Sequence, residues 1–313
     1  MYNKSMDQRN NIRLYIAGGL ALILIAVTAV TVLVLSSKES GSSDPSVVES
    51  LPSGTVTITD DPFLPEATGT ESAPDNDYSS YPLNTVSDCQ AVIEAYASDH
   101  GIDVFSYPVE IVNLLANNPD ALDFVLHYPE NAGTQDSPDY PGTIDVSSDY
   151  TTLRVPYYYQ YDIRWGYKSY AGGIMAMNGS GPTALSMVAS YLCGNSDMNP
   201  AWMASYAENN NYTMEGGTSW SLMSDGAIGL GIDVTPISAD QNRIERNLDV
   251  GNIVMCLMGP GDFTDSAQYI LIVGYSEEGY EIRDPGSPAR SSQIWTFDEL
   301  APQMDGCWIM RIL

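Results

Sequence analysis

The distribution of apolar residues divides the chain into three parts. Residues Leu14 to Leu35 form an unbroken run of 22 uncharged, mostly apolar side chains, close to the roughly 20 residues that a helix needs to cross a bilayer. Residues 36–85 are rich in Ser, Thr, Pro, Asp and Gly, a composition typical of a disordered stalk. From residue 86 onward, apolar positions recur first at helical spacing and then in strand-like runs.

Short helices are predicted within residues 86–150. In the stretch DCQAVIEAYASDHG, apolar residues recur at helical spacing and Gly101 is placed to end the helix. A second stretch, PVEIVNLLANNPDALDFVLHYPEN, has one apolar face, and Asn118 is expected to cap a further short helix inside it. Because these helices are only partly apolar, we expect them to pack on the domain that follows.

Residues 151–313 are predicted to form an α+β domain. The segment SGPTALSMVASYLCG is the clearest helix, with Ser180 at the N-cap, Pro182 in the first turn and Gly194 just past the end. Four later runs are predicted as strands: NIVMCLM (252–258), YILIVGY (269–275), GYEIRD (279–284) and CWIMRIL (307–313). A helix followed by an antiparallel sheet is an α+β arrangement.

The long apolar run at residues 14–35 is predicted to be an uncleaved membrane anchor. A secretory signal peptide is the alternative, but its apolar region is only about 7–15 residues long and ends in small residues. Three basic residues precede the run and only Lys38 follows it closely, which favours a cytoplasmic tail at residues 1–13. We therefore expect a single-pass protein of the cell membrane with residues 39–313 outside the cytoplasm.

The charge distribution narrows the range of partners. Residues 39–153 contain 21 Asp and Glu residues and no Lys or Arg. So acidic a surface repels phosphate backbones, and nucleic acid is not expected as a partner. Solubility is the simplest role for this charge; attraction to cations or basic cell-wall material is not required by it.

The four cysteines are Cys89, Cys193, Cys256 and Cys307. Outside the cytoplasm they have three possible pairings, and the sequence does not choose among them. Burial as small apolar side chains is the alternative that we favour. Their spacing does not suggest a metal site, and we expect neither a metal nor a cofactor.

Six motifs in order give the chain a resemblance. They are VPYYYQYDIRWGY (155–167), GSGPTALSMVASYL (179–192), GGTSW (216–220), MGPGDFT (258–264), AQYILIVGY (267–275) and RDPGSP (283–288). Together they resemble the C-39-like family of bacterial cysteine peptidases, relatives of the bacteriocin-leader peptidases with a papain-like fold. With the preceding helical stretch, the resemblance covers roughly residues 105–313.

The resemblance implies a catalytic site at four positions. In the family, a Cys at the start of the central helix is the nucleophile, a His on a facing strand is the base, an Asp orients the His and an upstream Gln stabilises the oxyanion. Gln160 and Asp284 match the last two roles. Where the family has Gly-Cys-Gly-Pro-Thr, this chain has GSGPT with Ser180, and where it has Gly-His-Phe, this chain has AQY with Gln268.

The replacement of the base is the more damaging change. A Ser hydroxyl acts as a nucleophile only when a base removes its proton, and the amide of Gln268 cannot take one. The chain has two imidazoles, His100 and His127, and both precede the domain. Lys168 is the domain's only lysine and is not adjacent to Ser180. We therefore predict that the machinery for peptide cleavage is absent.

Each site position also has a structural interpretation. Ser180 would serve as a helix N-cap, Gln268 would fill a polar pocket by bonding to Ser180 or Asp284, Asp284 would shape the turn before Pro285, and Gln160 would be a satisfied buried polar group. The aromatic residues Trp165, Trp220 and Trp295 are expected in the core or in a groove wall rather than on a ligand platform.

These observations lead to a membrane-anchored pseudopeptidase whose groove binds extended peptide or cell-wall stem peptide. Two alternatives remain open. One is a weakly active hydrolase, against which the missing imidazole argues. The other is a structural surface protein that uses the domain only as an interaction surface. Since a fold can outlive its chemistry, the family resemblance alone does not decide among them.

Overall fold

The computed structural model describes residues 76–136 and 144–313, all within one compact unit that spans residues 70–313. The predicted cytoplasmic tail, membrane anchor and most of the stalk lie outside these residues. In the part of the chain that is described, no helix is long and apolar enough to cross a membrane. Part of the predicted stalk lies within the described residues, where the side chains of Asn76 and Tyr78 donate hydrogen bonds to Asp99.

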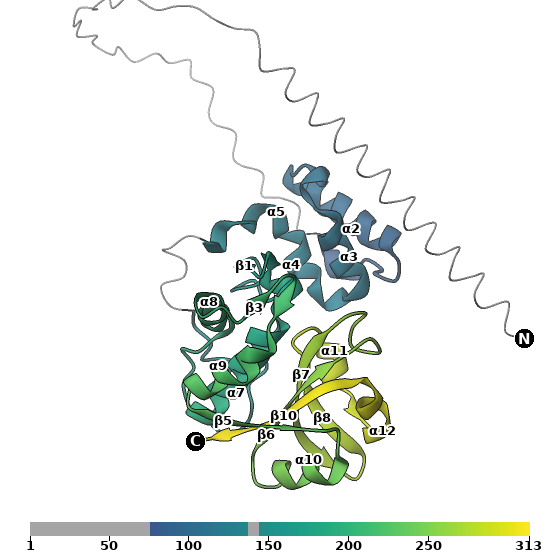
Figure 1. Cartoon of the computed structure of the whole chain (residues 1–313). Coiled ribbons are helices and arrows are strands. Elements are labelled where there is room, and N and C mark those ends of the chain that lie inside the picture. Colours follow the sequence, from purple (N-terminus) through teal and green to yellow (C-terminus); the bar gives the residue numbers. More distant parts are fainter. Residues whose placement is uncertain (1–75, 137–143) are drawn as a thin grey trace, which may run out of the picture. The chain divides into compact units, whose positions relative to one another are not determined.

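Among the described residues, four α-helices precede the domain at residues 151–313, and they are labelled in Figure 1. Thr85 and Asp88 form a capping box at the first, and Gly101, with φ of +66°, ends it as predicted. The helices share one hydrophobic cluster with the domain, in which the ring of Phe124 stacks on that of Tyr167 with centroids 4.3 Å apart. They are α2 (Val86–His100), α3 (Val109–Asn117), α4 (Leu122–Leu126) and α5 (Tyr128–Asn131).

The central helix α7 (Ser180–Cys193) is almost entirely buried, and Gly194 ends it with φ of +65°. The prediction of a helix from Ser180 to Gly194 is confirmed, but the predicted cap is wrong. The short helix α6 (Met175–Asn178) runs directly into this turn, and Gly179, between the two helices, occupies the N-cap position. No side chain caps the helix there. Ser180 is therefore the first helical residue.

The domain contains a six-stranded antiparallel sheet with the order β5-β10-β6-β7-β8-β9. All four predicted strands are present, and the sequence did not predict the edge strands β5 and β9. The mixture of helices with an antiparallel sheet agrees with the expected α+β, papain-like class. The strands are β5 (Ile232–Ile237), β6 (Ile253–Met258), β7 (Gln268–Ser276), β8 (Gly279–Arg283), β9 (Ile294–Trp295) and β10 (Met304–Ile312).

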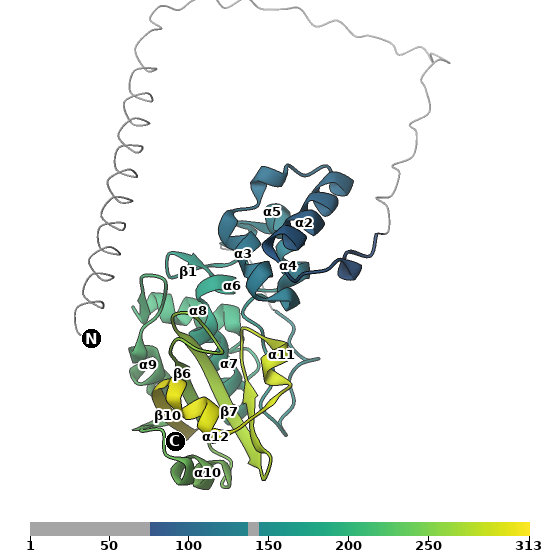
Figure 2. The same ribbon diagram turned by 90° about the vertical axis from the view of Figure 1, so that its right-hand side faces the viewer.

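Helices cover both faces of this sheet (Figure 2). Helix α7 packs on the face that carries Met255 and Leu257, within the largest hydrophobic cluster. Helix α10 (Gln241–Leu248) packs on the opposite face, where Ile244 contacts a second cluster containing Val254 and Cys256. This alternation along β6 is the period of two expected of a strand buried on both faces.

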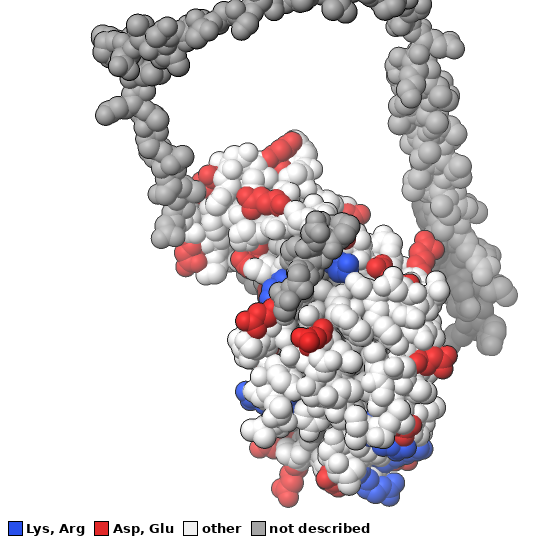
Figure 3. Space-filling view, turned by 90° about the vertical axis from the view of Figure 1, so that its left-hand side faces the viewer, with Lys and Arg blue, Asp and Glu red and all other residues white. Residues whose placement is uncertain are grey.

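Smaller elements complete the domain. Of the tryptophans predicted for the core or a groove wall, Trp165 and Trp295 are buried, whereas Trp220 is 54% exposed and packs edge-on against Trp308. The remaining elements are β1 (Ser169–Tyr170), β2 (Gly173–Ile174), α8 (Pro200–Asn209), β3 (Thr213–Met214), β4 (Gly217–Thr218), α9 (Asp225–Gly229), α11 (Pro288–Ser291) and α12 (Phe297–Leu300). Acidic side chains are spread over the face in Figure 3 rather than gathered into one patch.

Candidate functional site

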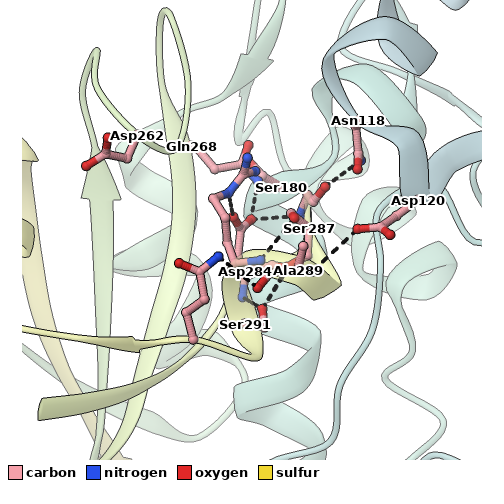
Figure 4. A network of polar contacts seen from close by, with 12 residues as sticks. Asn118, Asp120, Ser180, Asp262, Gln268, Asp284, Ser287, Ala289 and Ser291 are labelled. Atoms are coloured by element: carbon pink, nitrogen blue, oxygen red, sulfur yellow. Dashed lines mark hydrogen bonds and ion pairs between the residues drawn. The ribbon is translucent and has the colours of Figure 1, made fainter. Parts of the chain in front are cut away.

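The four positions singled out in the sequence come together in the structure, and Figure 4 shows Ser180, Gln268 and Asp284 among them. Gln160 lies in the loop before β1, Ser180 begins α7, Gln268 begins β7 and Asp284 follows β8 directly. None is more than 8% exposed, and Asp284 is fully buried. Two neighbouring strands, one helix end and one loop thus build a single buried polar site.

Gln268 bridges the other two polar residues on its side of the site. Its Nε2 donates to Oδ1 of Asp284 at 2.9 Å and lies 3.2 Å from Oε1 of Gln160. The expected contact between Gln268 and Asp284 is therefore present, and a contact with Gln160 accompanies it. The amide of Gln268 thus lies between the carboxylate of Asp284 and the side chain of Gln160.

Ser180 takes part in a different contact. Its Oγ accepts the backbone N–H of Tyr269 at 3.3 Å, and no N–H of its own helix is capped by it. Behind it, the second glycine of the GSGPT motif fits closely against the GGTSW motif. A Cβ added at Gly181 would lie 2.4 Å from Oγ1 of Thr218, so this helix end tolerates no larger residue without rearrangement.

Gln160 is fixed on both its side chain and its backbone. Its Nε2 donates to the carbonyl of Ala176 at 2.7 Å, and its backbone N–H donates to the carbonyl of Pro285 at 2.9 Å. One of the two N–H protons of the Gln160 side chain is thus donated to a backbone carbonyl of the protein and is not available to an oxyanion. The site satisfies its own polar groups, as buried polar groups require.

Asp284 forms a buried ion pair that the sequence did not reveal. Nε of Arg290, on α11, lies 2.6 Å from Oδ2 of Asp284. Oδ1 also accepts the backbone N–H of Gly286 at 2.7 Å, so the turn role and the site role of Asp284 coexist. Burial raises the pKa of Asp284 above its ordinary value, although the ion pair with Arg290 opposes this.

Two further residues position the loop that carries Asp284. The hydroxyl of Tyr157 donates within 3.0 Å of the carbonyls of Asp284 and Ser287. From the helical region, Nδ2 of Asn118 donates to the carbonyl of Gly286 at 2.6 Å. Asn118 occupies the predicted N-cap position, at the 3-10 turn Pro119–Ala121 that leads into α4, but its side chain makes no cap hydrogen bond and instead ties the helices to the site.

A groove of about 450 Å³ opens onto the site. Its floor includes Gln160 and Gln268, and the loop between β6 and β7 forms one rim with Asp262 and Asp265. The end of α3 forms another part of the wall. The lining residues are Leu114, Asn117, Asn118, Gln160, Tyr161, Ala176, Met177, Gly261, Asp262, Phe263, Thr264, Asp265, Ser266, Gln268, Gly286 and Arg290.

Comparison with protein families gives a match over residues 152–311, to the Peptidase_C39 like family. The chain belongs to this family. Among solved structures, it is similar to the peptidase domain of Streptococcus ComA, a bifunctional ABC transporter involved in a quorum-sensing pathway. The two are 20% identical, with a TM-score of 0.36, over 44% of this chain and 93% of that one. No curated protein sequence matches the chain.

In this family member, both imidazoles lie away from the site. His100 stacks on Tyr96 with ring centroids 4.0 Å apart, and His127 is bound to Asp123 in the same helical region. Within residues 76–136 and 144–313, no group of three His, Cys, Asp or Glu side chains could hold a metal ion. The carboxylate of Asp284 is the one ionisable group of the four positions, and Arg290 already binds it.

The arrangement is suited to binding rather than to proton transfer. General-base catalysis needs a group within hydrogen-bond reach of the proton that it removes, and the residue nearest to that role, Gln268, has an amide in place of a base. The groove presents amides, hydroxyls and backbone groups together with apolar walls. Carboxylates at Asp262 and Asp265 and the guanidinium of Arg290 add charged groups to the same lining.

Proposed function

We propose that the protein is a membrane-anchored pseudopeptidase that binds peptide, including cell-wall stem peptide, outside the cytoplasm without cutting it. The observation that carries the proposal is the amide of Gln268, held between Asp284 and Gln160 where the family places its base. Removing a nucleophile or a base from a catalytic triad costs on the order of 10⁶ in rate in a well-studied case. Here both are replaced.

The groove supports the binding half of the proposal. Its volume of about 450 Å³ falls in the range of roughly 300–1,000 Å³ typical of ligand sites. It combines apolar contacts, such as Met177 and Phe263, with polar groups at its floor. The ion pair of Arg290 with Asp284 and the bond from Asn118 to Gly286 hold this floor in one arrangement, which lowers the entropy cost of binding.

The binding half is tested by narrowing the groove. Met177 lines it and is 40% exposed, so Met177→Trp places a bulky ring inside. For the full chain in detergent, we expect calorimetry with a synthetic stem pentapeptide and an unrelated extended hexapeptide to give a Kd at least ten-fold higher in this variant, about 1.4 kcal/mol. Ile228→Trp is the matched control, since Ile228 is 49% exposed on α9, outside the groove.

The same peptides test the absence of catalysis. We expect mass spectrometry to recover them uncut after long incubation with the unmodified protein. Steady cleavage that disappears in Ser180→Ala would contradict the proposal and establish a serine hydrolase. Failure of both peptides to bind, with an unchanged melting temperature in every variant, would instead support a purely structural role.

The location is tested separately. The basic residues before Leu14 support an orientation in which the later part of the chain lies outside the cytoplasm. Protease added to intact cells is therefore expected to release a fragment that contains residues 76–313. Lysed cells serve as the positive control, and full protection of the fragment in intact cells would reverse the orientation.

A further inference from the structure

Two thiols lie opposite each other in the middle of the sheet. Cys256 on β6 and Cys307 on β10 are register partners in adjacent antiparallel strands. Their Sγ atoms are 3.5 Å apart, and the two residues are 0% and 3% exposed. Both belong to the cluster on the face covered by α10, so the side chains point the same way.

This placement suits a covalent bond. Residues directly opposite in antiparallel strands have Cα atoms roughly 4.5–5.5 Å apart, within the roughly 4.4–6.8 Å that disulfides span. The sulfurs need to approach by only about 1.5 Å to reach a bond of about 2.05 Å. Rotation about the Cα–Cβ bonds supplies that movement, and the backbone register already fits.

The other two cysteines lie in different surroundings. Cys89 is buried in the cluster of the helical region, whereas Cys193 is partly buried at the end of α7, with its Sγ 3.7 Å from the carbonyl of Leu230. Of the three ways to pair four cysteines, the geometry supports one bond, between Cys256 and Cys307.

The strands that carry these thiols also hold one rim of the groove. β6 leads directly into the loop at residues 259–267, and the residue before β10, Gln303, holds that loop at two points. Gly259 donates its N–H to the carbonyl of Gln303, and Asp262 donates its N–H to Oε1 of the same residue, both at 2.7 Å. A link between the strands therefore lies at the base of this rim.

We propose that Cys256 and Cys307 form a disulfide that fixes the base of the groove-rim loop at residues 259–267. The oxidant is a small-molecule or protein disulfide. The thiolate of Cys307 attacks one of its sulfurs and releases a first thiol, and the thiolate of Cys256 then attacks the mixed disulfide and releases a second. Two protein thiols are oxidised, one external disulfide is reduced, and the two protons end on the released thiols.

In the reduced, folded domain the two thiols differ in acidity. A hydrogen bond from the Cys256 thiol lowers the pKa of Cys307, whereas that bond and burial raise the pKa of Cys256. Since neither sulfur is open to solvent in the folded domain, the exchange takes place before the sheet closes. Folding and oxidation are therefore coupled.

Peptide mapping is the direct test. The full chain is refolded in detergent with a mixture of reduced and oxidised glutathione, acid-quenched, treated with N-ethylmaleimide and digested without reductant. We expect one cross-linked peptide that joins residues 256 and 307, while Cys89 and Cys193 carry the alkyl label. Alkyl label on all four positions, or a cross-link between any other two, would overturn the proposal.

The role of the bond is tested by comparing oxidised with reduced protein. We expect the melting temperature to be roughly 5 °C higher when oxidised, and amide hydrogen exchange in residues 259–267 to be slower. Cys307→Ala should lose this redox difference, whereas Cys89→Ala, which removes an equally buried thiol, should keep it. Each comparison is made within one variant, so the cost of a cavity cancels. A cross-link without any change in melting or exchange would refute the anchoring role.

Discussion

The two sides of the candidate site differ in how firmly they are held. On the strand side, Gln268, Asp284 and Arg290 form a chain of contacts of 2.6–2.9 Å that extends to the backbone of Gly286. On the helix side, Ser180 accepts a single hydrogen bond of 3.3 Å from Tyr269. The strand side is thus a connected network of hydrogen bonds, whereas Ser180 lies at the helix end with little contact of its own.

The comparison shows which side of the site is tied more tightly into the fold. A helix N-terminus stabilises a thiolate through its free N–H groups and dipole, and that environment is still present at residue 180. On the strand side, Arg290 binds one oxygen of the Asp284 carboxylate, and the amide of Gln268, which cannot act as a base, binds the other. Ser180→Cys alone would therefore supply a nucleophile without the base that peptide cleavage also needs.

The strongest test of this comparison is to rebuild both halves. Ser180→Cys together with Gln268→His is expected to cleave peptides at a rate on the order of 10²-fold or more above either single variant, because such residues act as a unit. Cleavage assays and an active-site thiol probe are the measurements. Each single variant is the control, and equal activity in Ser180→Cys alone would show that the strand side was not limiting.

The next test concerns the ion pair on the strand side. Arg290→Gln leaves the buried carboxylate of Asp284 without its cation, and we expect a loss of about 3 kcal/mol in the free energy of unfolding at neutral pH. Arg311→Gln is the control, because Arg311 pairs with Asp233 at the surface, where ion pairs contribute roughly 0–1 kcal/mol. Equal losses in both variants, measured by urea unfolding, would count against a special role for Arg290.

The pH dependence of that variant follows from the direction of the Asp284 shift. The pKa of Asp284 is raised in the folded state, so the folded protein binds the proton more tightly than the unfolded chain does. Stability from this group is complete below the unfolded pKa of about 3.9 and is lost as pH rises through the folded pKa. Without Arg290 the pKa rises further, so the Arg290→Gln defect should shrink as the pH is lowered toward about 4.

The smallest expected effect is on the helix side. Ser180→Ala removes one weak acceptor, and the free energy of unfolding should change by no more than about 0.5 kcal/mol. Ser186→Ala is the control on the same helix, since the hydroxyl of Ser186 is buried and donates to the carbonyl of Met198 at 2.6 Å; its loss should cost about 1 kcal/mol. A larger cost at Ser180 than at Ser186 would reverse the comparison.

Much of this site was accessible from the sequence, and the limits have physical causes. The helix from Ser180 and the central strands follow from local patterns of apolar residues. The order of the motifs predicted that Gln160 and Asp284 lie in the same site. The partners of Asn118 and Tyr157 lie 168 and 127 residues away, and no local pattern encodes such contacts. Arg290 is only six residues from Asp284, but a surface arginine has the same sequence signature.

The missed edge strand β5 and the misplaced cap of α7 have local explanations. β5 contains Asp233 and Pro236, residues that are unusual in strands and tolerated at a sheet edge. At the start of α7, the preceding turn places Gly179 at the cap position, and Ser180, a residue with strong capping preference, falls one position later. The helix therefore begins one residue earlier than predicted. Ser180 becomes its first residue, and the hydroxyl contacts Tyr269 instead of capping the helix.

The stacking of Phe124 on Tyr167 has a consequence for synthesis. The ribosome releases the helical region first, and its apolar face stays uncovered until Tyr167 and Ala176 have been translated, since both belong to the same cluster. The hydroxyl of Tyr167 also donates to the carbonyl of Phe124 at 2.9 Å. Nascent helices in this position are exposed to misassociation for as long as translation of the following segment takes. Because the chain is synthesised from its N-terminus, the early helices need transient protection until the segment that covers them has been translated.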